Sequence, residues 1–379
     1  MEIRPTSDPC GLSDEVLAAL RLNLVPGVGP RMRQELLARF GSARAVLAAA
    51  PSRLREVPGV GQKLCSAIAA ASADHGLPAE IEHCRQHGVS LVVEGQPAYP
   101  RLLREIPDPP GVLFVRGTIE PQDSLAIAVV GTRHATAYGV RQAERLAGSL
   151  ARAGVTIVSG LARGIDAAAH RAALEAGGRT LAVLPGSVTE VYPAEHRDLA
   201  VHIAQHGAVL SENPSDSRPR RGTFPRRNRL ITGLSVGVVI VEASLRSGAL
   251  ISANHAMEQG REVFAVPGRV DSRASRGCHR LLRDGAKLVE TVDDILDELG
   301  PLVENVPRNR GGPLLRHPAE LRLNEQEQQV LAAVGEEPTT IDQVVVRSGL
   351  PVHRVLSTIS VLEMRRLVTR LSGNTVVRS

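Results

Sequence analysis

The sequence predicts an α/β protein built around a doubly wound parallel sheet, with a helical domain before the sheet and a small domain after it. A length of 379 residues suggests two or three domains. Between Leu125 and Leu299, short apolar runs alternate with helical patterns, which is typical of parallel strands joined by helical crossovers. Two similar glycine turns, centred on Gly27 and Gly59, indicate a duplicated helical unit near the N-terminus.

The composition fits a folded protein and excludes one large class of nucleotide-binding enzymes. Hydrophobic residues make up 43% of the chain and charged residues 22%, which is enough apolar material for packed cores. The net charge of +5 weakly favours polyanionic partners. Lysine occurs only at Lys63 and Lys287, so nearly all of the 45 basic residues are arginines. Neither lysine stands in a Gly-Lys-Ser/Thr sequence, which excludes a P-loop ATPase.

Rare residue types narrow the chemistry further. The chain has no Trp, 3 Tyr and 4 Phe, so a nucleic-acid contact is expected to rely on phosphates more than on stacking. The four cysteines show no spacing typical of a zinc site or a disulfide framework; they are Cys10, Cys65, Cys84 and Cys278. The N-terminus has no apolar core of a signal peptide, and no run of about 18 apolar residues predicts a membrane span. We therefore expect a cytoplasmic protein with no metal and no cofactor.

The first part, residues 1–78, is expected to form a helical domain. The turns Val25-Pro26-Gly27-Val28-Gly29 and Val57-Pro58-Gly59-Val60-Gly61 each lie between apolar helical segments and resemble helix-hairpin-helix loops. Such a turn can bring backbone amides and the start of the next helix close to a phosphate. The same tight turn also serves helix packing, and little charge accompanies the loops beyond Arg31, Arg33 and Lys63. Both roles stay open at this point.

Residues 79–124 are expected to connect the helical domain to the sheet. A helical pattern (Glu80–Gly88) and a short strand (Ser90–Gly95) come first. A proline-rich stretch follows, and its prolines interrupt any long element.

The sheet domain is expected over residues 125–299. Its short apolar runs predict strands buried on both faces, with helices between them. In chain order, the predicted strands are Leu125–Val130, Val155–Val158, Thr180–Leu184, Ala208–Leu210, Val236–Val241 and Glu262–Val266.

The C-terminal part predicts a linker and a small domain. Residues 300–321 are rich in Pro, Gly and Arg, which is typical of a linker. Residues 322–379 show three helical patterns and then a possible hairpin, which indicates a winged helix-turn-helix module. The third helical segment (Val352–Leu367) is apolar along much of its length, which favours packing against a partner or another domain. Its arginines leave weak DNA contact open; they are Arg354, Arg365 and Arg366.

The loops after the first two strands of the sheet are candidate anion sites. In open parallel sheets, ligands bind at the carboxyl ends of the strands, where helix N-termini favour anions. Arg133 and Arg163 lie in these two loops and are the side chains that a phosphate site would use. No G-x-G-x-x-G sequence follows the first strand, so a dinucleotide pocket is not expected. We interpret Asp166 as the N-cap of the following helix.

The densest positive charge lies between Arg218 and Arg229, where six arginines accompany Phe224 and only Asp216 stands nearby as an acid. We interpret this run as a loop beside Arg133 that binds a polyphosphate. Phe224 could stack on a base or anchor the loop. Ser247 and Gly248 add a hydroxyl and amides at the start of a later helix. A further basic surface follows the last long strand and comprises Arg269, Arg273, Arg276, Arg280, Arg283 and Lys287.

Two patterns that suggest catalysis or metal binding are interpreted as accidental. Gly233–Gly237 matches G-x-S-x-G, but a nucleophile elbow needs a strand before the serine and a helix after it, and here a strand follows. His83, Cys84 and His87 share a helix but have no fourth ligand.

Five motifs follow one another along the sheet domain. In order, they are Ala128–Gly139 (AVVGTRHATAYG), Ser159–His170 (SGLARGIDAAAH), Phe224–Ser235 (FPRRNRLITGLS), Val241–Gly268 and Gly277–Val289. Together they resemble the DprA (Smf) family of DNA-processing proteins of natural transformation. The resemblance implies a helix-hairpin-helix (SAM-like) domain, an extended Rossmann-like sheet domain and a winged helix. It also implies a homodimer without enzymatic activity that binds and protects incoming single-stranded DNA and loads the RecA recombinase on it.

The resemblance also implies which residues form the DNA-binding pocket of the sheet domain. By position they are Arg133, Gly160, Arg163, Arg221, Phe224, Arg227, Asn228, Ser247 and Gly248, with Lys287 as a weaker candidate. Leu184–Ser187 stands where the family usually has a Gly-Cys-Gly-like turn, which could reshape one wall of the pocket. His196 and His279 stand where the family usually has Asn, and these changes are small.

The alternative hypothesis is a nucleotide-processing enzyme on the same kind of fold. Relatives that cleave a nucleoside monophosphate carry a P-G-G-x-G-T-x-x-E loop, and Pro185–Glu190 keeps only part of it. Its only plausible acids would be Glu190, Glu212 and Glu242.

Overall fold

The computed structural model describes residues 13–71, 76–303, 325–335, 338–364, 367–371 and 374–378. The chain forms two compact units, the first ending at Leu288 and the second beginning at Val289. The predicted linker from residue 304 onward lies outside the described residues, as do Cys10, Arg365 and Arg366.

A nine-stranded sheet with the order β1-β2-β6-β5-β4-β3-β7-β8-β9 is the centre of the first unit. Its strands are β1 (Val89–Val93), β2 (Val112–Gly117), β3 (Ala126–Val130), β4 (Thr156–Ser159), β5 (Thr180–Val183), β6 (Gly207–Ser211), β7 (Gly237–Ile240), β8 (Glu262–Ala265) and β9 (Lys287–Leu288). From β6 to β9 in this sheet order, each strand is parallel to the next one. The six strands predicted for the sheet are β3 to β8, each within one residue of its predicted ends.

Residues 79–124 do more than connect, because they contribute β1 and β2 to the sheet. These two strands pair antiparallel with each other, and β2 pairs antiparallel with β6. The apolar residues of β2 are buried although the strand directly follows a proline-rich stretch. The sequence pattern predicted β1 but not β2, since the prolines before it indicated irregular structure.

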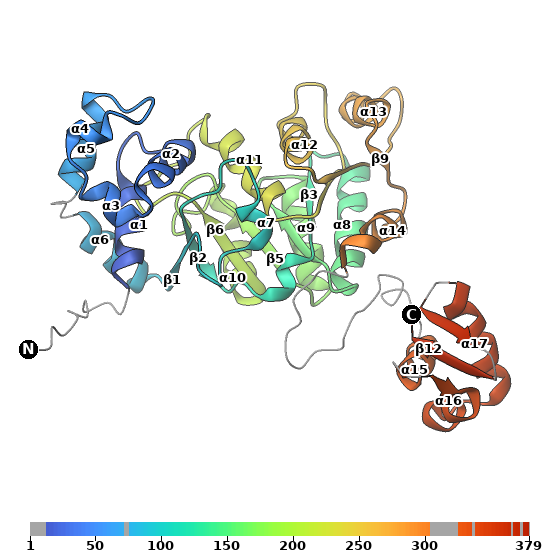
Figure 1. Ribbon diagram of the computed structural model, residues 1–379. Coiled ribbons are helices and arrows are strands. Elements are labelled where there is room, and N and C mark those ends of the chain that lie inside the picture. The colour runs from blue at the N-terminus through green and yellow to red at the C-terminus, as the bar shows by residue number, and fades with distance from the viewer. Residues whose placement is uncertain are drawn as a thin grey trace, which may run out of the picture. The chain divides into compact units, whose positions relative to one another are not determined.

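Helices cover both faces of the sheet (Figure 1). The helices α8 (Ala137–Arg152), α9 (Ile165–Glu175) and α10 (Arg197–His206) lie on one face, and α7 (Arg101–Arg104), α11 (Thr223–Gly233), α12 (Ala249–Glu258) and α13 (Arg276–Arg283) lie on the other. Two short 3₁₀ helices, η1 (Pro121–Ser124) and η2 (Ala194–His196), lie in loops.

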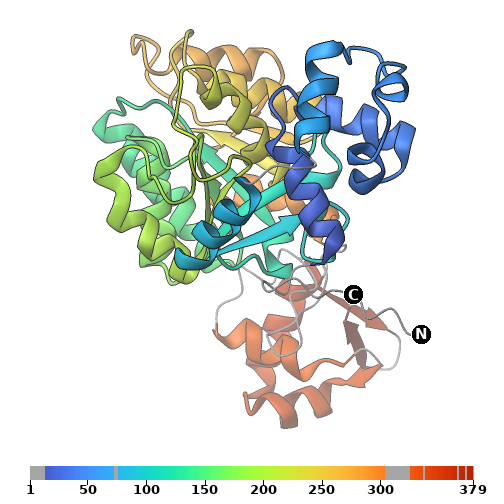
Figure 2. The same ribbon diagram turned by 90° about the vertical axis from the view of Figure 1, so that its left-hand side faces the viewer.

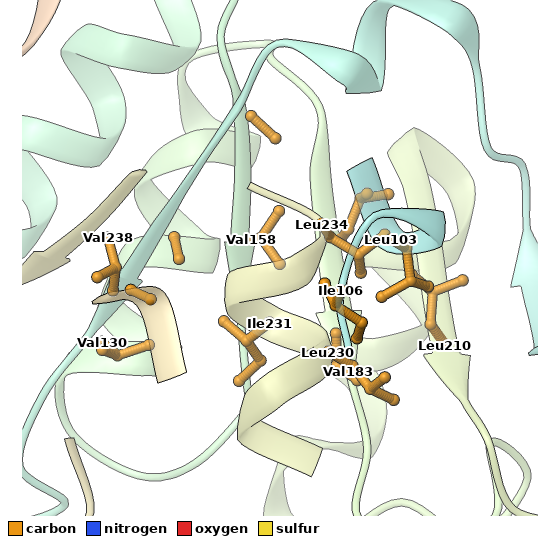
Figure 3. Packing of buried hydrophobic residues seen from close by; sticks show 14 of the residues in the cluster. Leu103, Ile106, Val130, Val158, Val183, Leu210, Leu230, Ile231, Leu234 and Val238 are labelled. Atoms are coloured by element: carbon orange, nitrogen blue, oxygen red, sulfur yellow. The ribbon is translucent and has the colours of Figure 1, made fainter. Parts of the chain in front are cut away.

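Alternate residues of each strand serve these two faces, as the pleat of a strand requires. In β5, Leu181 and Val183 join the cluster beneath α11 and α12, whereas Ala182 joins the cluster beneath α9 and α10. Figure 3 shows Leu230 of α11 beside Val183 of β5, and Ile231 and Val158 belong to the same buried cluster. Apolar packing against the strands therefore helps to position α11.

In its described residues, 13–71 and 76–86, the N-terminal domain forms six helices, which are drawn in blue in Figure 2. They are α1 (Asp14–Leu24), α2 (Pro30–Phe40), α3 (Ala43–Leu47), α4 (Pro51–Leu54), α5 (Gln62–Ala71) and α6 (Gly76–Gln86). The two predicted turns join α1 to α2 and α4 to α5. This is the arrangement of two helix-hairpin-helix units, as the duplication predicted.

The two hairpins pack on each other reciprocally. Gly27 and Gly59 adopt the left-handed region, with φ of +96° and +83°. A Cβ atom on Gly27 would lie 3.4 Å from Cδ1 of Leu64, and one on Gly59 would lie 3.0 Å from Cε of Met32. Met32 and Leu64 are separated by 32 positions, as the two glycines are. Each turn therefore contacts the second helix of the other hairpin, which supports the packing role of these glycines.

The helical domain is joined to the β1 side of the sheet. Leu20 of α1, together with Leu77 and Ile81 of α6, belongs to the same buried cluster as Val89 of β1. Figure 1 shows α1 and α6 next to β1. An ion pair between Arg33 of α2 and Glu94 adds a polar contact.

The second unit contains α14 (Val292–Val303), α15 (Glu325–Ala333), α16 (Ile341–Ser348) and α17 (Val352–Met364), with the strands β10 (Thr339–Thr340), β11 (Val368–Leu371) and β12 (Thr375–Arg378). The strands form an antiparallel sheet in the order β10-β12-β11. The helices α15 to α17 and this sheet form the predicted winged helix. Val355, Ile359 and Leu362 of α17 are buried in the core of this unit. The apolar side of α17 therefore packs inside its own domain, and no binding partner is needed to explain its apolar residues.

None of the helices in the described ranges is long and apolar enough to cross a membrane.

Gly117 offers a test of the contact between β2 and β6. It has φ of +100°, and a Cβ atom there would lie 2.4 Å from the carbonyl oxygen of Gly207. We expect Gly117→Ala to cost about 1–2 kcal/mol for the left-handed backbone and about 1–3 kcal/mol more for overpacking. Gly177→Ala, with φ of +72° and open space around it, is the matched control and should show only the first cost. Urea unfolding followed by circular dichroism measures both; equal losses would contradict the assigned contact.

His170 of α9 predicts a pH dependence of stability. It is fully buried, and its Nδ1 donates to Oγ1 of Thr180 over 2.7 Å. Burial, with smaller contributions from the nearby positive charges, lowers the pKa of His170 to about 3 from its ordinary value of 6.5. As the pH falls below 6.5, the unfolded chain therefore takes up a proton that the folded chain does not. We expect the free energy of unfolding to decrease by about 1 kcal/mol per pH unit between pH 6.5 and 3 from this group. Urea unfolding at several pH values measures this dependence. In His170→Leu, the free energy of unfolding should fall less steeply with decreasing pH than in the wild type.

Candidate nucleic-acid interface

A cavity of about 340 Å³ lies at the carboxyl ends of the central strands. The chain runs from β3 to β6 toward one edge of the sheet and from β7 to β9 toward the other. The loops after β3 and β7 therefore diverge, and a crevice at this switch point is the usual ligand site of open α/β sheets. Both loops line the cavity, together with the first turns of α11 and α12.

The structure brings together eight of the ten residues that the sequence predicted for the site. The large cavity is lined by Arg133, Phe224, Arg227, Asn228, Ser247 and Gly248. A smaller adjoining cavity is lined by Gly160 and Arg163, and it shares Arg133, Phe224 and Arg227 with the first. Arg221 and Lys287 line neither cavity: Arg221 lies in the loop before α11 and Lys287 in the edge strand β9.

Arg227 is a buried structural group. Its side chain is 5% exposed, and its Nη1 donates to the carbonyl oxygens of Gly160 over 2.6 Å and of Val183. Burial lowers the pKa of Arg227 to about 10, against the opposing effect of Asp166. These bonds connect α11 to the ends of β4 and β5. Glycine at position 160 leaves room for this guanidinium, because a Cβ atom there would collide with Nη1 of Arg227.

Asp166 carries the negative charge near Arg227. It is the second residue of α9, whose N-cap is Gly164, so its interpretation as the N-cap was wrong. Its Oδ2 instead accepts from the amides of Gly160 and Ala162, over 3.2 and 3.4 Å. The carboxylate therefore shapes the loop after β4. Burial raises the pKa of Asp166, and the charge of Arg227 acts against that rise.

The arginine run from Arg218 to Arg229 is not a single loop with free cations. Its second half forms α11, which places Arg226, Arg227 and Arg229 on a helix. Arg229 is buried between Glu212 and Asp108, whose Oδ2 lies 3.2 Å from Nε. Arg226 lies 3.9 Å from Glu212, and Arg218 lies 3.6 Å from Glu190. The prediction that only Asp216 faces these cations was wrong, because acids from distant parts of the chain fold against them.

Arg133 and Arg163 remain on the surface and differ in their surroundings. The guanidinium of Arg133 lies 4.7 Å from the centre of the Phe224 ring. Among the described residues, Arg133 forms no ion pair. Arg163 forms two hydrogen bonds to Glu195, over 2.7 and 2.6 Å, and this arginine lowers the pKa of Glu195. An anion therefore meets at Arg133 a cation without a close ion pair among the described residues, although Asp166 lines the same cavity, whereas Arg163 is already paired with Glu195.

The first turn of α12 adds polar groups to the cavity. Oγ of Ser247 accepts from the amide of Ala249 over 3.3 Å, and Nδ2 of Asn228 donates to the carbonyl oxygen of Gly248 over 3.4 Å. This helix start and Arg133 lie around one cavity, and both favour an anion.

Contacts from the N-terminal domain hold the loops around the site. Glu80 of α6 accepts from the amide and the hydroxyl of Ser215, over 2.9 and 2.6 Å, in the loop that leads to α11. Nε2 of His83 lies 3.1 Å from Oγ1 of Thr189, in the loop after β5.

The acids of the alternative enzymatic hypothesis serve structural roles. Glu242 is buried and accepts from the amide and hydroxyl of Thr136 at the start of α8, over 2.9 and 2.6 Å. Glu212 pairs with Arg229, and Glu190 pairs with Arg218. None of these three carboxylates lines the two cavities of the candidate site, so they do not converge on a ligand there; Glu242 lines a separate cavity beside Tyr138 and Pro267.

The residues that depart from the family pattern keep simple contacts. Nδ1 of His196 donates to the carbonyl oxygen of Leu161 over 2.8 Å, and Nε2 of His279 donates to that of Gly268 over 3.0 Å. An asparagine amide can donate in the same way.

Ser235, the serine of the accidental G-x-S-x-G match, is buried and donates to the carbonyl oxygen of Ile231 over 2.9 Å.

Among the lining residues that sequence reasoning did not assign to the site are His134 and Tyr192. His134 lies beside Arg133 and lines the large cavity, and Tyr192 lines the smaller one. His134 stands within the first motif, so the motif itself could have indicated it. Tyr192 belongs to the loop after β5, and no local pattern marks it as part of the site.

Family models match three parts of the chain. The model of DNA recombination-mediator protein A matches residues 90–300, that of the DprA winged helix domain matches 316–374, and that of the SAM-like helix-hairpin-helix tandem matches 19–74. The chain belongs to the DNA recombination-mediator protein A (DprA/Smf) family. The extended Rossmann-like sheet, the helix-hairpin-helix domain and the winged helix are thereby confirmed.

Relatives of this family resemble the chain over most of its length. The protein Smf of Synechocystis is 37% identical over 92% of this chain and 95% of its own length. The X-ray structure of DprA from Streptococcus pneumoniae, at 32% identity, matches with a TM-score of 0.67 over 76% of this chain and 99% of that chain. DprA from Helicobacter pylori, whose structure is described for its single-stranded DNA binding mode, matches at 33% identity with a TM-score of 0.51, over 56% of this chain and 95% of that chain.

Asp166 tests the buried charges behind the site. Asp166→Ala leaves Arg227 buried without its nearby opposite charge and removes the acceptor for two amides. We expect a loss of about 3–5 kcal/mol in the free energy of unfolding. Asp198→Ala is the control, because Asp198 lies exposed in the first turn of α10. Urea unfolding measures both variants, and a similar small loss in each would show that Asp166 does not support Arg227.

Proposed function

We propose that this protein binds single-stranded DNA through the cavities at the carboxyl ends of β3, β4 and β7. The observation that carries the proposal is the position of Arg133, an exposed cation without an ion pair among the described residues, at the same cavity as the first turn of α12. The family membership supports a role in DNA processing, and the H. pylori relative binds single-stranded DNA.

The expected binding mode follows from the kind of groups present. Cations and amides contact phosphates, which carry no sequence information, so binding should be nearly independent of sequence. The cavity lies between loops and suits one strand better than a duplex, whose two backbones are held apart by paired bases.

We further propose that the protein is a homodimer that protects incoming DNA and loads the RecA recombinase on it during natural transformation. The resemblance of the five motifs to the family supports this proposal. Its tests are the mass of the protein in solution by light scattering and the rate at which RecA filaments form on DNA covered by a single-strand binding protein. A monomer, or an unchanged rate, would contradict the corresponding part.

Arg133→Ala tests the phosphate contact. A charge-assisted hydrogen bond contributes about 1.5–3 kcal/mol, so we expect roughly ten- to hundredfold weaker binding of oligo-dT. The slope of log K against log[salt] should become shallower by about 0.7 for each phosphate contact that is lost. Fluorescence anisotropy across a salt series measures both, with a matched duplex as a second ligand.

Arg152→Ala is the control for Arg133→Ala, because Arg152 is exposed on α8 and its loss changes the net charge equally. An equal effect of the two substitutions would contradict the assigned site. Wild-type binding that ignores salt, or that favours the duplex, would contradict the proposed function itself.

Glu195→Gln tests whether the ion pair with Glu195 weakens the binding of DNA by Arg163. The substitution removes the charge that competes with a phosphate for the guanidinium. We expect binding to become several-fold tighter and the salt slope to become steeper by about 0.7, which corresponds to one added contact. Glu175→Gln, at the exposed end of α9, changes the net charge in the same way and should have little effect. If both variants bind alike, Arg163 does not contact the DNA.

A further inference from the structure

Tyr192 is an exposed aromatic residue in a chain that has few of them. The sequence holds 3 Tyr, 4 Phe and no Trp. Tyr192 is 48% exposed, which is more than any other aromatic side chain of this protein. Leaving so much of an aromatic ring in water gives up part of the free energy that its burial would contribute.

The hydroxyl of Tyr192 also differs from those of the other two tyrosines. Tyr99 donates to the carbonyl oxygen of Pro110 over 2.7 Å, and Tyr138 donates to that of Pro267 over 2.6 Å. The hydroxyl of Tyr192 has no hydrogen-bond partner within the described ranges. Neither burial nor a hydrogen bond therefore explains a tyrosine at this position.

The surroundings of Tyr192 are those of the candidate DNA site. It lines the smaller cavity together with Gly160, Arg163 and Phe224. Its ring centre lies 5.7 Å from that of Phe224, at an interplanar angle of 66°, so the two rings meet edge to face. Phe224 also contacts the guanidinium of Arg133, which lies 4.7 Å from its ring centre.

A strand bound at this cavity therefore meets an aromatic ring as well as cations. Arg133 and Arg163 can contact phosphates, and the ring of Tyr192 is planar, as a nucleobase is. Aromatic side chains stack on bases of single strands without regard to sequence. Phe224 packs against Tyr192 edge to face, and nearly half of Tyr192 stays accessible.

We propose that Tyr192 stacks on an unpaired base of the bound strand and thereby selects single-stranded DNA over duplex. This inference rests on the proposed function. In a duplex, the faces of the bases are covered by neighbouring base pairs, so only an unpaired strand offers a free face to Tyr192. The site then reads the absence of base pairing directly, in addition to the phosphate contacts that both forms of DNA offer.

The test compares oligo-dT with an abasic oligomer of the same length, which keeps the phosphates and lacks the bases. Both are titrated by anisotropy against the full-length protein and its Tyr192→Ala and Tyr192→Phe variants. We expect Tyr192→Ala to weaken oligo-dT binding by roughly 5- to 100-fold, as alanine substitution of stacking residues does. Binding of the abasic oligomer should stay unchanged, and Tyr192→Phe should retain the affinity for oligo-dT.

Tyrosine fluorescence supplies a second measurement, because the chain has no Trp to mask it. Oligo-dT should quench the emission of the wild type. The quenching should vanish in Tyr192→Phe although that variant still binds.

Each other outcome is distinct. If Tyr192→Ala binds oligo-dT as the wild type does, the stacking role is overturned and the proposed function stands. If it weakens both oligomers equally, Tyr192 only shapes the loop, and the stacking role is again overturned. If the wild type binds neither oligomer, the proposed function itself fails.

Discussion

The buried guanidinium of Arg227 connects the parts of the protein on which the candidate site depends. Arg227 belongs to α11 and donates to the carbonyl oxygens at the ends of β4 and β5. Its charge lies near Asp166, whose carboxylate holds the loop between β4 and α9 through two amides. A charge in such a place is stable only with these partners, because an unpaired buried charge is very costly. The helix, the two strand ends and the loop are therefore constrained together.

This constraint divides the arginines of the site into two groups. Arg227 and Arg229 are buried structural residues. Their N–H groups already donate to carbonyl and carboxylate oxygens of the protein, so they are not available to a ligand. Arg133 lies on the surface against Phe224, and Arg163 lies on the surface against Glu195. The arginine run from Arg218 to Arg229 thus offers a ligand fewer accessible cations than its number of arginines indicates. The cations that a phosphate can reach come from the separate loops after β3 and β4.

Most of the fold could be predicted because its elements carry local signals. The strands β3 to β8 are short apolar runs with helical patterns between them, and the two glycine turns reveal the duplicated hairpins. β2 escaped prediction because its apolar residues follow directly after a proline-rich stretch, and only pairing with β1 and β6 makes it a strand. The start of α11 was not predicted for a similar reason, because a run of arginines and prolines is typical of a loop. Here the helix forms because Leu230, Ile231 and Leu234 pack against the sheet.

The three-part architecture, the family resemblance and eight of the residues that line the two cavities could be predicted from the amino-acid sequence. These depend on residue type, spacing and motif order, which are properties of the chain. The tertiary structure alone decided the role of each residue. Whether an arginine is free or buried depends on acids and carbonyls that are distant in sequence, such as Asp108 for Arg229 and Val183 for Arg227. Tyr192 likewise joins Phe224 only when the loop after β5 folds beside α11, because such a contact leaves no periodic trace in the sequence.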